Sequence, residues 1–267
     1  MPMNEEKREQ ITNKIQEFTL FDDEFMTAVF NKNIESTELL LRIILEQNLK
    51  VTEVLTQYVV HNLYGHSIKM DIHAIGENGQ EMDIEVQKDN SGAVPKRARY
   101  NSSLIDGNCL EAGKDYNKLP ESLIIFITEN DVLEGNLPIY HIERTIVETG
   151  QNFDDKAHII YVNGAMEEDT PLGKLVHDFK CKEPDDMNYK ELRNRANYYK
   201  KDEEGVERMS KIMQELVNEA VDEKQRNNAI KLLKLKKLSK EEIADTLELP
   251  LEEIDKLAEE LKPMALV

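Results

Sequence analysis

Acidic and amide side chains recur at every second position of one short segment, at Asp83, Glu85 and Gln87. Successive side chains of a strand point to opposite faces, so this spacing places all three on one face of a predicted strand. The preceding segment carries Asp71, and a three-residue loop ending at Gly79 joins the two segments. Glycine supplies the positive φ that such a loop needs, and the resulting hairpin sets Asp71 directly across from Glu85. Two carboxylates at that spacing can bind a hard divalent cation.

A basic segment follows this hairpin and contains Lys96, Arg97, Arg99 and Tyr100. Proline suits the first turn of a helix, so we expect a helix from Pro95 to about Leu110. Guanidinium groups match the oxygens of phosphate, and this helix is therefore expected to bind nucleic acid beside the carboxylates. An exposed basic face without a ligand is the alternative.

The segments around the hairpin predict the elements that position it. We expect a largely buried helix over residues 36–48, capped by Ser36, and a β-branched strand over residues 54–63. Residues 122–128 are continuously apolar, as in a strand that is buried on both faces. The order of helix, three strands, helix and buried strand predicts an α/β fold.

The last part of the chain differs in character from the rest. Residues 182–186 indicate a linker, so we expect one domain over residues 1–184 and a charged, all-helical extension over residues 185–267. Within the extension, Ser239 and Glu242 fit a reciprocal helix cap at the start of a helix-turn-helix-like hairpin. The second helix of this hairpin is rich in carboxylates, which repel phosphate, so packing or oligomerisation is favoured over DNA reading. The extension could pair two copies into a homodimer.

Composition excludes several classes of protein. The chain has 267 residues, of which 40% are hydrophobic, and it contains no apolar run near the ~20 residues that a membrane span needs. The charged N-terminal segment lacks the apolar core of a signal peptide, so we expect a cytoplasmic protein. The two cysteines, Cys109 and Cys181, form no motif, which indicates neither a disulfide framework nor a cysteine-based zinc site.

The net charge of −19 opposes tight, non-specific binding of nucleic acid. Basic residues are nevertheless clustered in two segments, residues 88–100 and residues 224–240, the second of which contains no acid. Local basic patches could therefore bind nucleic acid in spite of the overall charge. Residues 224–240 also fit an amphipathic helix that packs its leucines inward and exposes its lysines, and the sequence leaves these two interpretations open.

The order of these motifs resembles that of a known nuclease superfamily. Asp71 followed by Glu85-Val86-Gln87 is similar to the PD-(D/E)XK pattern, and most similar to the branch of nuclease family transposases, also called recombination-promoting nucleases, in which the last motif residue is commonly Gln. The segment Phe21–Phe30 is similar to the opening motif of that branch. The resemblance covers roughly residues 20–180.

The resemblance implies a restriction-endonuclease-like αβββαβ core sandwich and a DNA endonuclease that depends on Mg²⁺ or Mn²⁺. It implies that Asp71, Glu85 and the main-chain carbonyl of Val86 hold the metal ion. Gln87 stands where many relatives have a lysine that positions the attacking water. Glu38 on the first helix is a further candidate acid, with an ordinary surface role as the equal alternative.

Gln87 is neutral and cannot supply the electrostatic contribution of a lysine, although its amide can hydrogen-bond a water molecule. Lys69, Lys88 or Arg99 could supply the missing charge, and the sequence does not decide among them. The function implied by the resemblance is phosphodiester hydrolysis linked to mobile elements or recombination. Its main alternative is a catalytically silent, nuclease-derived interaction or regulatory protein, which the net charge and Gln87 favour.

Overall fold

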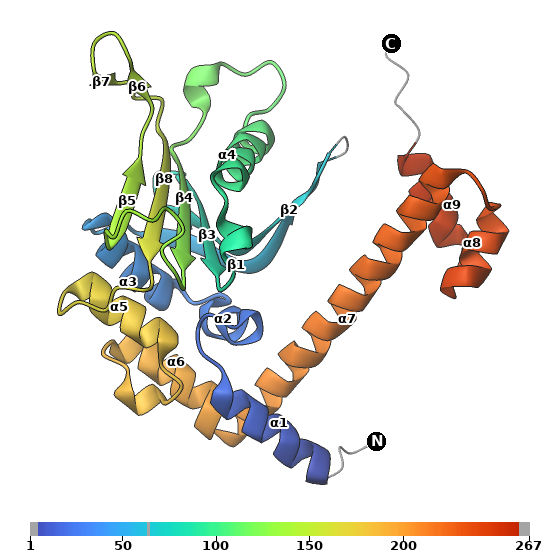
Figure 1. Cartoon of the computed structure of the whole chain (residues 1–267), viewed down its shortest axis with the longest axis horizontal. Coiled ribbons are helices and arrows are strands. Elements are labelled where there is room, and N and C mark those ends of the chain that lie inside the picture. Colours follow the sequence, from blue (N-terminus) through green and yellow to red (C-terminus); the bar gives the residue numbers. More distant parts are fainter. Residues whose placement is uncertain (1–4, 63–64, 262–267) are drawn as a thin grey trace. The chain divides into compact units, whose positions relative to one another are not determined.

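The computed structural model describes residues 5–62 and 65–261, and it divides the chain into two compact units over residues 1–210 and 211–267 (Figure 1). We expected the division after residue 184, but α6 (Lys190–Lys201) packs within the first unit. Its buried residues Leu192, Ala196 and Tyr199 form an apolar stripe at helical spacing. The many charges around that stripe make the segment resemble a solvated extension in the sequence.

A six-stranded mixed sheet in the order β1-β2-β3-β4-β8-β5 forms the centre of the first unit. Its first three strands are antiparallel neighbours, β3, β4 and β8 run parallel, and β5 is antiparallel to β8. The strands are β1 (Val51–Val60), β2 (Ile68–Gly76), β3 (Glu81–Gln87), β4 (Ser122–Thr128), β5 (Ile139–Ile142) and β8 (Ala157–Asn163), and β6 (Thr145–Ile146) pairs with β7 (Gln151–Asn152) in a separate ribbon. The predicted α/β fold is confirmed.

The β2–β3 hairpin has the register that the sequence predicts. Ile72 pairs with Ile84 and His73 with Asp83, which sets Asp71 across from Glu85. Gly79 closes the three-residue loop at a φ of 79°. Strand β1 begins at residue 51, three residues before the expected start at 54, and ends at residue 60; residue 63 of the expected strand lies outside the described residues.

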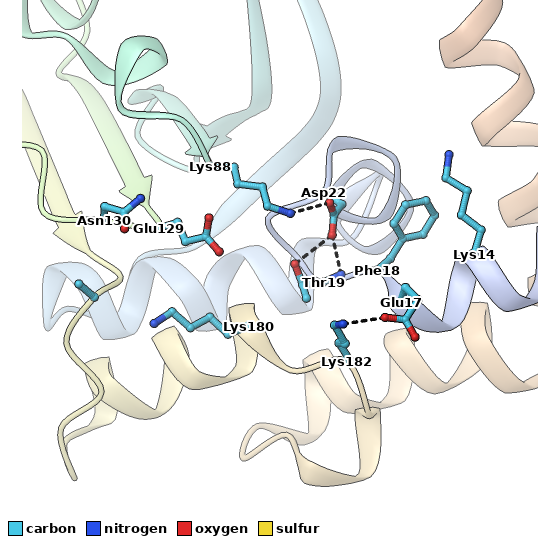
Figure 2. A pocket seen from close by; sticks show the side chains of 11 residues that line it. Lys14, Glu17, Phe18, Thr19, Asp22, Lys88, Glu129, Asn130, Lys180 and Lys182 are labelled. Atoms are coloured by element: carbon cyan, nitrogen blue, oxygen red, sulfur yellow. Dashed lines mark hydrogen bonds and ion pairs between the residues drawn. The ribbon is translucent and has the colours of Figure 1, made fainter.

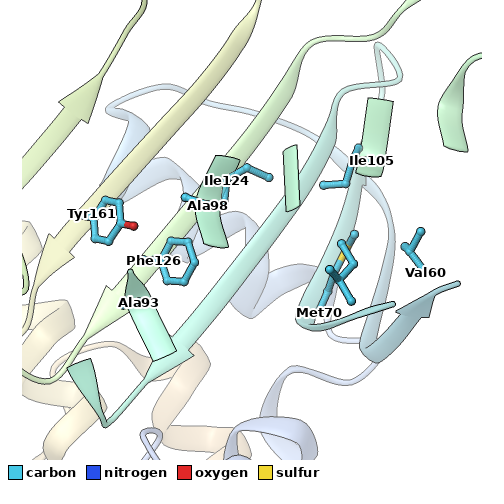
Figure 3. Close-up of a cluster of buried hydrophobic side chains, with 9 residues drawn as sticks. Val60, Met70, Ala93, Ala98, Ile105, Ile124, Phe126 and Tyr161 are labelled. Atoms are coloured by element: carbon cyan, nitrogen blue, oxygen red, sulfur yellow. The ribbon is translucent and has the colours of Figure 1, made fainter. Parts of the chain in front are cut away.

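Helices cover both faces of the sheet. Helix α4 (Pro95–Cys109) begins at the predicted proline and packs Ala98 and Ile105 against Ile124 and Phe126 of β4 (Figure 3). The remaining helices of the first unit are α1 (Glu5–Glu17), α2 (Asp23–Phe30), α3 (Ile34–Leu45) and α5 (Pro171–Lys180). Helices α2 and α3 contact β1, and α5 and α6 pack against them. Strand β4, between β3 and β8 and in contact with α4, is buried at every residue.

Two caps fix the ends of these helices. Helix α3 begins at residue 34 rather than 36, because the Asn33 side chain accepts a hydrogen bond from the Ser36 N–H at 3.2 Å. Ser36 is therefore a buried residue of the first turn and not the cap. On α6, the buried Lys200 ammonium donates to the carbonyls of Gln16, at 3.0 Å, and of Phe18 and Lys182. This contact ties α6 to the end of α1.

The second unit consists of α8 (Lys240–Leu247), α9 (Leu251–Glu260) and the part of the long helix α7 (Glu203–Leu235) from residue 211 onward. Its core includes Ala229, Ile243, Ile254 and Leu257. The predicted reciprocal cap between Ser239 and Glu242 is confirmed. Within residues 224–235, Ala229 is buried, Ile230, Leu232 and Leu233 pack against this core, and the lysines are exposed, which favours the amphipathic interpretation of this basic run, although Leu235 is 58% exposed. Among the described residues, no helix is long and apolar enough to cross a membrane.

Candidate active site

Asp71 and Glu85 meet at the amide group of Gln87. The Gln87 Nε2 donates to Asp71 Oδ2 at 3.1 Å and to Glu85 Oε2 at 3.0 Å. The two carboxylate oxygens therefore lie no more than about 6 Å apart. The main-chain N–H of Val86 also donates to Asp71 Oδ2, at 2.8 Å. The three motif residues thus point to one place, and a hydrogen-bond donor stands between the two acids.

A third carboxylate, Asp83, lies deeper under α4. Its side chain is fully buried, and Asn101 Nδ2 donates to Asp83 Oδ2 at 2.8 Å and to Glu85 Oε1 at 3.2 Å. The sequence suggests no role for Asn101 by itself. It does, however, follow Arg97 by four residues, and residues at this spacing share one face of a helix. This four-residue spacing from Arg97 is the signal in the sequence that could have placed Asn101 near the acids.

Arg97 is the cation that contacts the acids. One guanidinium nitrogen contacts Glu85 Oε2, while the other donates to the Gly92 carbonyl at 2.8 Å and to Gln87 Oε1 at 3.4 Å. The guanidinium carbon also lies 5.9 Å from the centre of the Phe126 ring. Arg97 thus places a positive charge beside Gln87 and Glu85.

Burial dominates the electrostatics of this cluster. It raises the pKa of Asp71 to about 7, of Asp83 to about 6 and of Glu85 to about 10. The charge of Arg97 acts in the opposite direction on all three carboxyl groups. Ionisation of all three buried carboxyls at neutral pH would place an excess of negative charge in the cluster beside Arg97, which additional positive charge would offset. Oxygen donors in this setting fit a Mg²⁺ or Mn²⁺ ion.

Asp23, at the start of α2, is a helical acid whose charge acts on the cluster. Its charge contributes to raising the pKa of Asp71. Burial and the charge of Glu24 raise the pKa of Asp23 itself, and the charges of Lys69 and Arg97 lower it. The signal in the sequence is the acidic run at residues 22–24, directly before the apolar residues of α2.

Glu38, the acid that we expected on the first helix, lies elsewhere. Its carboxylate accepts hydrogen bonds from the Val51 N–H and from Lys50, each at 3.1 Å. Val51 pairs with Gly76, which is five residues along β2 from Asp71, or roughly 17 Å at the usual rise of a strand. The structure therefore does not bring Glu38 to the cluster.

Only some of the residues expected to bind nucleic acid lie near the acids. Lys96 and Arg99 are exposed on α4 near Arg97. The Tyr100 hydroxyl accepts a hydrogen bond from Asn62 at 2.9 Å and donates to the carbonyl of His66. Tyr100 thus contacts Asn62 and His66 through its hydroxyl rather than the carboxylates.

An open cavity of about 760 Å³ adjoins the carboxyl ends of β3 and β4 (Figure 2). Lys88, which follows Gln87, turns into this cavity and pairs with Asp22 at 3.1 Å. Lys182 pairs with Glu17 at 2.6 Å on the same wall. Lys88 and Lys182 are thus each paired with an acid, and Lys88 is directed toward Asp22.

A second group of metal-ligand types, His177, Asp178 and Cys181, lies at the end of α5, with its ligand atoms within 4.8 Å of one another. Both oxygens of Asp178 already accept main-chain hydrogen bonds, from the N–H of Asn188 at 2.7 Å and of Tyr189 at 2.8 Å. Burial raises the pKa of the Cys181 thiol to about 11, which keeps it protonated. We interpret this group as the junction between α5 and α6.

A mixed sheet whose hairpin presents an Asp and a Glu-x-Gln motif under a basic helix defines a nuclease-like α/β protein. The family model for the PD-(D/E)XK nuclease family transposases matches residues 25–168, more than half of the chain, and the chain belongs to this family. The resemblance drawn from the sequence is thereby confirmed. Proteins of this fold typically bind divalent metal ions. Neither the curated proteins nor the solved structures contain a match to the chain.

Proposed function

We propose that the protein is a Mg²⁺- or Mn²⁺-dependent DNA endonuclease that acts in the movement or recombination of DNA. The observation that supports this most directly is the Gln87 amide, which hydrogen-bonds both Asp71 Oδ2 and Glu85 Oε2. A donor between two buried carboxylates marks the place where positive charge is stabilised. In this proposal Asp71, Glu85 and the Val86 carbonyl would hold the ion, and the ion would supply an activated water and neutralise charge on the phosphate.

The remaining roles belong to Gln87 and Arg97. Once a bound ion replaces its two contacts with Asp71 and Glu85, the Gln87 amide would be able to hydrogen-bond a water and so orient that water toward a phosphate. Arg97 supplies the charge that Gln87 lacks, because its guanidinium is adjacent to Gln87 and its side chain is 34% exposed. Once Glu85 has another cation beside it, Arg97 is available to bind the scissile phosphate. Lys96 and Arg99 extend this contact along the DNA backbone.

Plasmid cleavage tests the proposal. Incubation of supercoiled DNA with the protein and Mg²⁺ or Mn²⁺ should give nicked or linear products, and a chelator should abolish them. Asp71→Ala and Glu85→Ala should each remove the activity. Intact plasmid with wild-type protein, or full activity in both variants, would refute it.

A second candidate function is that of a nuclease-derived interaction protein without turnover. Two observations favour it: Arg97 already contacts Glu85 Oε2, and the net charge of −19 opposes binding to DNA. Calorimetric titration with Mg²⁺ and Mn²⁺ separates the two candidates, because only the endonuclease requires the ion. A homodimer formed through the helical extension stays a prediction, which sedimentation of the full chain would test.

A further inference from the structure

Asn101 occupies the inner side of the acidic cluster, where it is 1% exposed. Its amide nitrogen donates one hydrogen bond to Asp83 and one to Glu85, which uses both of its hydrogens. Its Oδ1 is buried and has no hydrogen-bond partner among the described residues. The two acids therefore fix the orientation of the amide, since the reverse orientation would place Oδ1 against both carboxylates.

The partners of Glu85 are divided between its two oxygens. Oε1 accepts from Asn101, whereas Oε2 is contacted by Gln87 and Arg97. Glu85 is fully buried, so water cannot replace a lost partner. Asn101 thus holds the inner oxygen toward α4, and this leaves the outer oxygen directed at Gln87 and Asp71.

We propose that Asn101, anchored by Asp83, is a positioning residue that aims the Glu85 carboxylate at the metal-binding place. This inference rests on the proposed function. Asn101 acts only through Glu85, because its burial prevents contact with DNA. An amide suits the task because it offers two donors in one plane, whereas aspartate offers none and serine one. Groups that hold a metal ligand in place typically change metal affinity ~10–100-fold when they are removed.

The test is the affinity of the full chain for Mn²⁺, measured by calorimetry, together with KM and kcat on plasmid DNA. Asn101→Ala should weaken Mn²⁺ binding by ~10–100-fold and lower kcat at a fixed Mn²⁺ concentration, with KM for DNA unchanged. Asn101→Ser, which keeps one donor, should give an intermediate loss. Asn108→Ala is the matched control, because Asn108 is an exposed asparagine on the same helix whose amide donates to the Leu104 carbonyl.

The outcomes separate this inference from the function on which it rests. A folded Asn101→Ala protein that binds Mn²⁺ as tightly as wild type overturns the inference alone. If Asn101→Ala does not fold, wild-type affinity in Asn101→Ser has the same consequence. A rise in KM without a change in Mn²⁺ affinity also overturns it, because that pattern indicates a contact with DNA. Wild-type protein that binds no Mn²⁺ overturns both proposals.

Discussion

Replacement of Asp71 by asparagine should stabilise the metal-free protein. The Asp71 side chain is buried, and its pKa is raised from 3.8 to about 7. A carboxyl whose pKa is higher in the folded state stabilises the fold fully only below its ordinary pKa. That stability is lost as the pH rises from 3.8 to about 7. The neutral amide of asparagine avoids this loss, while its oxygen can still accept the Val86 N–H.

The size of the effect follows from the shift in pKa. At ~1.4 kcal/mol for each pH unit, the rise of the Asp71 pKa to about 7 corresponds to roughly 4 kcal/mol at neutral pH. Asp83 and Glu85 also lose a repulsive neighbour, while Arg97 loses an attractive one. We therefore expect Asp71→Asn to raise the free energy of unfolding by about 1–4 kcal/mol, and Tm by several degrees, at pH 8.

Thermal unfolding with a chelator present measures this difference at pH 8 and at pH 5. The gain in Tm should be large at pH 8 and small at pH 5, because at pH 5 protonation of Asp71 already removes most of its buried charge from the wild-type protein. Mn²⁺ should then raise the Tm of wild type and leave that of Asp71→Asn unchanged. A variant that melts below wild type at pH 8, or that gains equal stability from Mn²⁺, would refute the reasoning.

Three further changes test other parts of the structure. Arg97→Ala should lower the single-turnover cleavage rate by roughly 100-fold or more. Arg97→Lys should not restore the rate, because a lysine cannot make the forked contacts of a guanidinium. Equal rates in wild type and both variants would contradict a phosphate-binding role for Arg97. Asp23→Ala should slow plasmid nicking, whereas Glu38→Ala should leave the nicking rate within about twofold of wild type. Slower nicking by Glu38→Ala than by Asp23→Ala would indicate that Glu38, and not Asp23, acts in the site. Lys200→Ala should lower the free energy of unfolding by roughly 3 kcal/mol or more, because it removes the donor that three main-chain carbonyls share. Urea denaturation measures this loss, and a loss below about 1 kcal/mol would argue against the contact.

The hairpin and its acids could be predicted from the sequence because their signals are local. The alternation from Asp83 to Gln87 gives the face, and the loop that ends at Gly79 gives the register. Likewise, the uninterrupted apolar run of β4 and the proline at the start of α4 define those elements without reference to the rest of the chain.

The remaining features depend on contacts between distant segments. Glu38 and Asp23 are both acids on helices before β1, and only packing decides that α2 presents Asp23 to Asp71 while α3 presents Glu38 to Val51. Arg97 was expected on the right helix, but its contact with Glu85 depends on how α4 lies across β3. The alternation places Asp83 on the face of Glu85, but only the packing of α4 shows that Asp83 is as fully buried as Glu85 and bonded to Asn101.

The contact of Lys200 with residues 16–18 has a consequence for which piece of the chain can exist by itself. A polypeptide cut at the apparent linker near residue 184 would lack α6, whose buried face covers apolar side chains of α2 such as Phe25. Its N-terminal helix would also lose the ammonium group that gathers the carbonyls at its end. We therefore expect the smallest fragment that folds by itself to extend through α6, so that synthesis must continue well beyond the acidic hairpin before the first unit is complete.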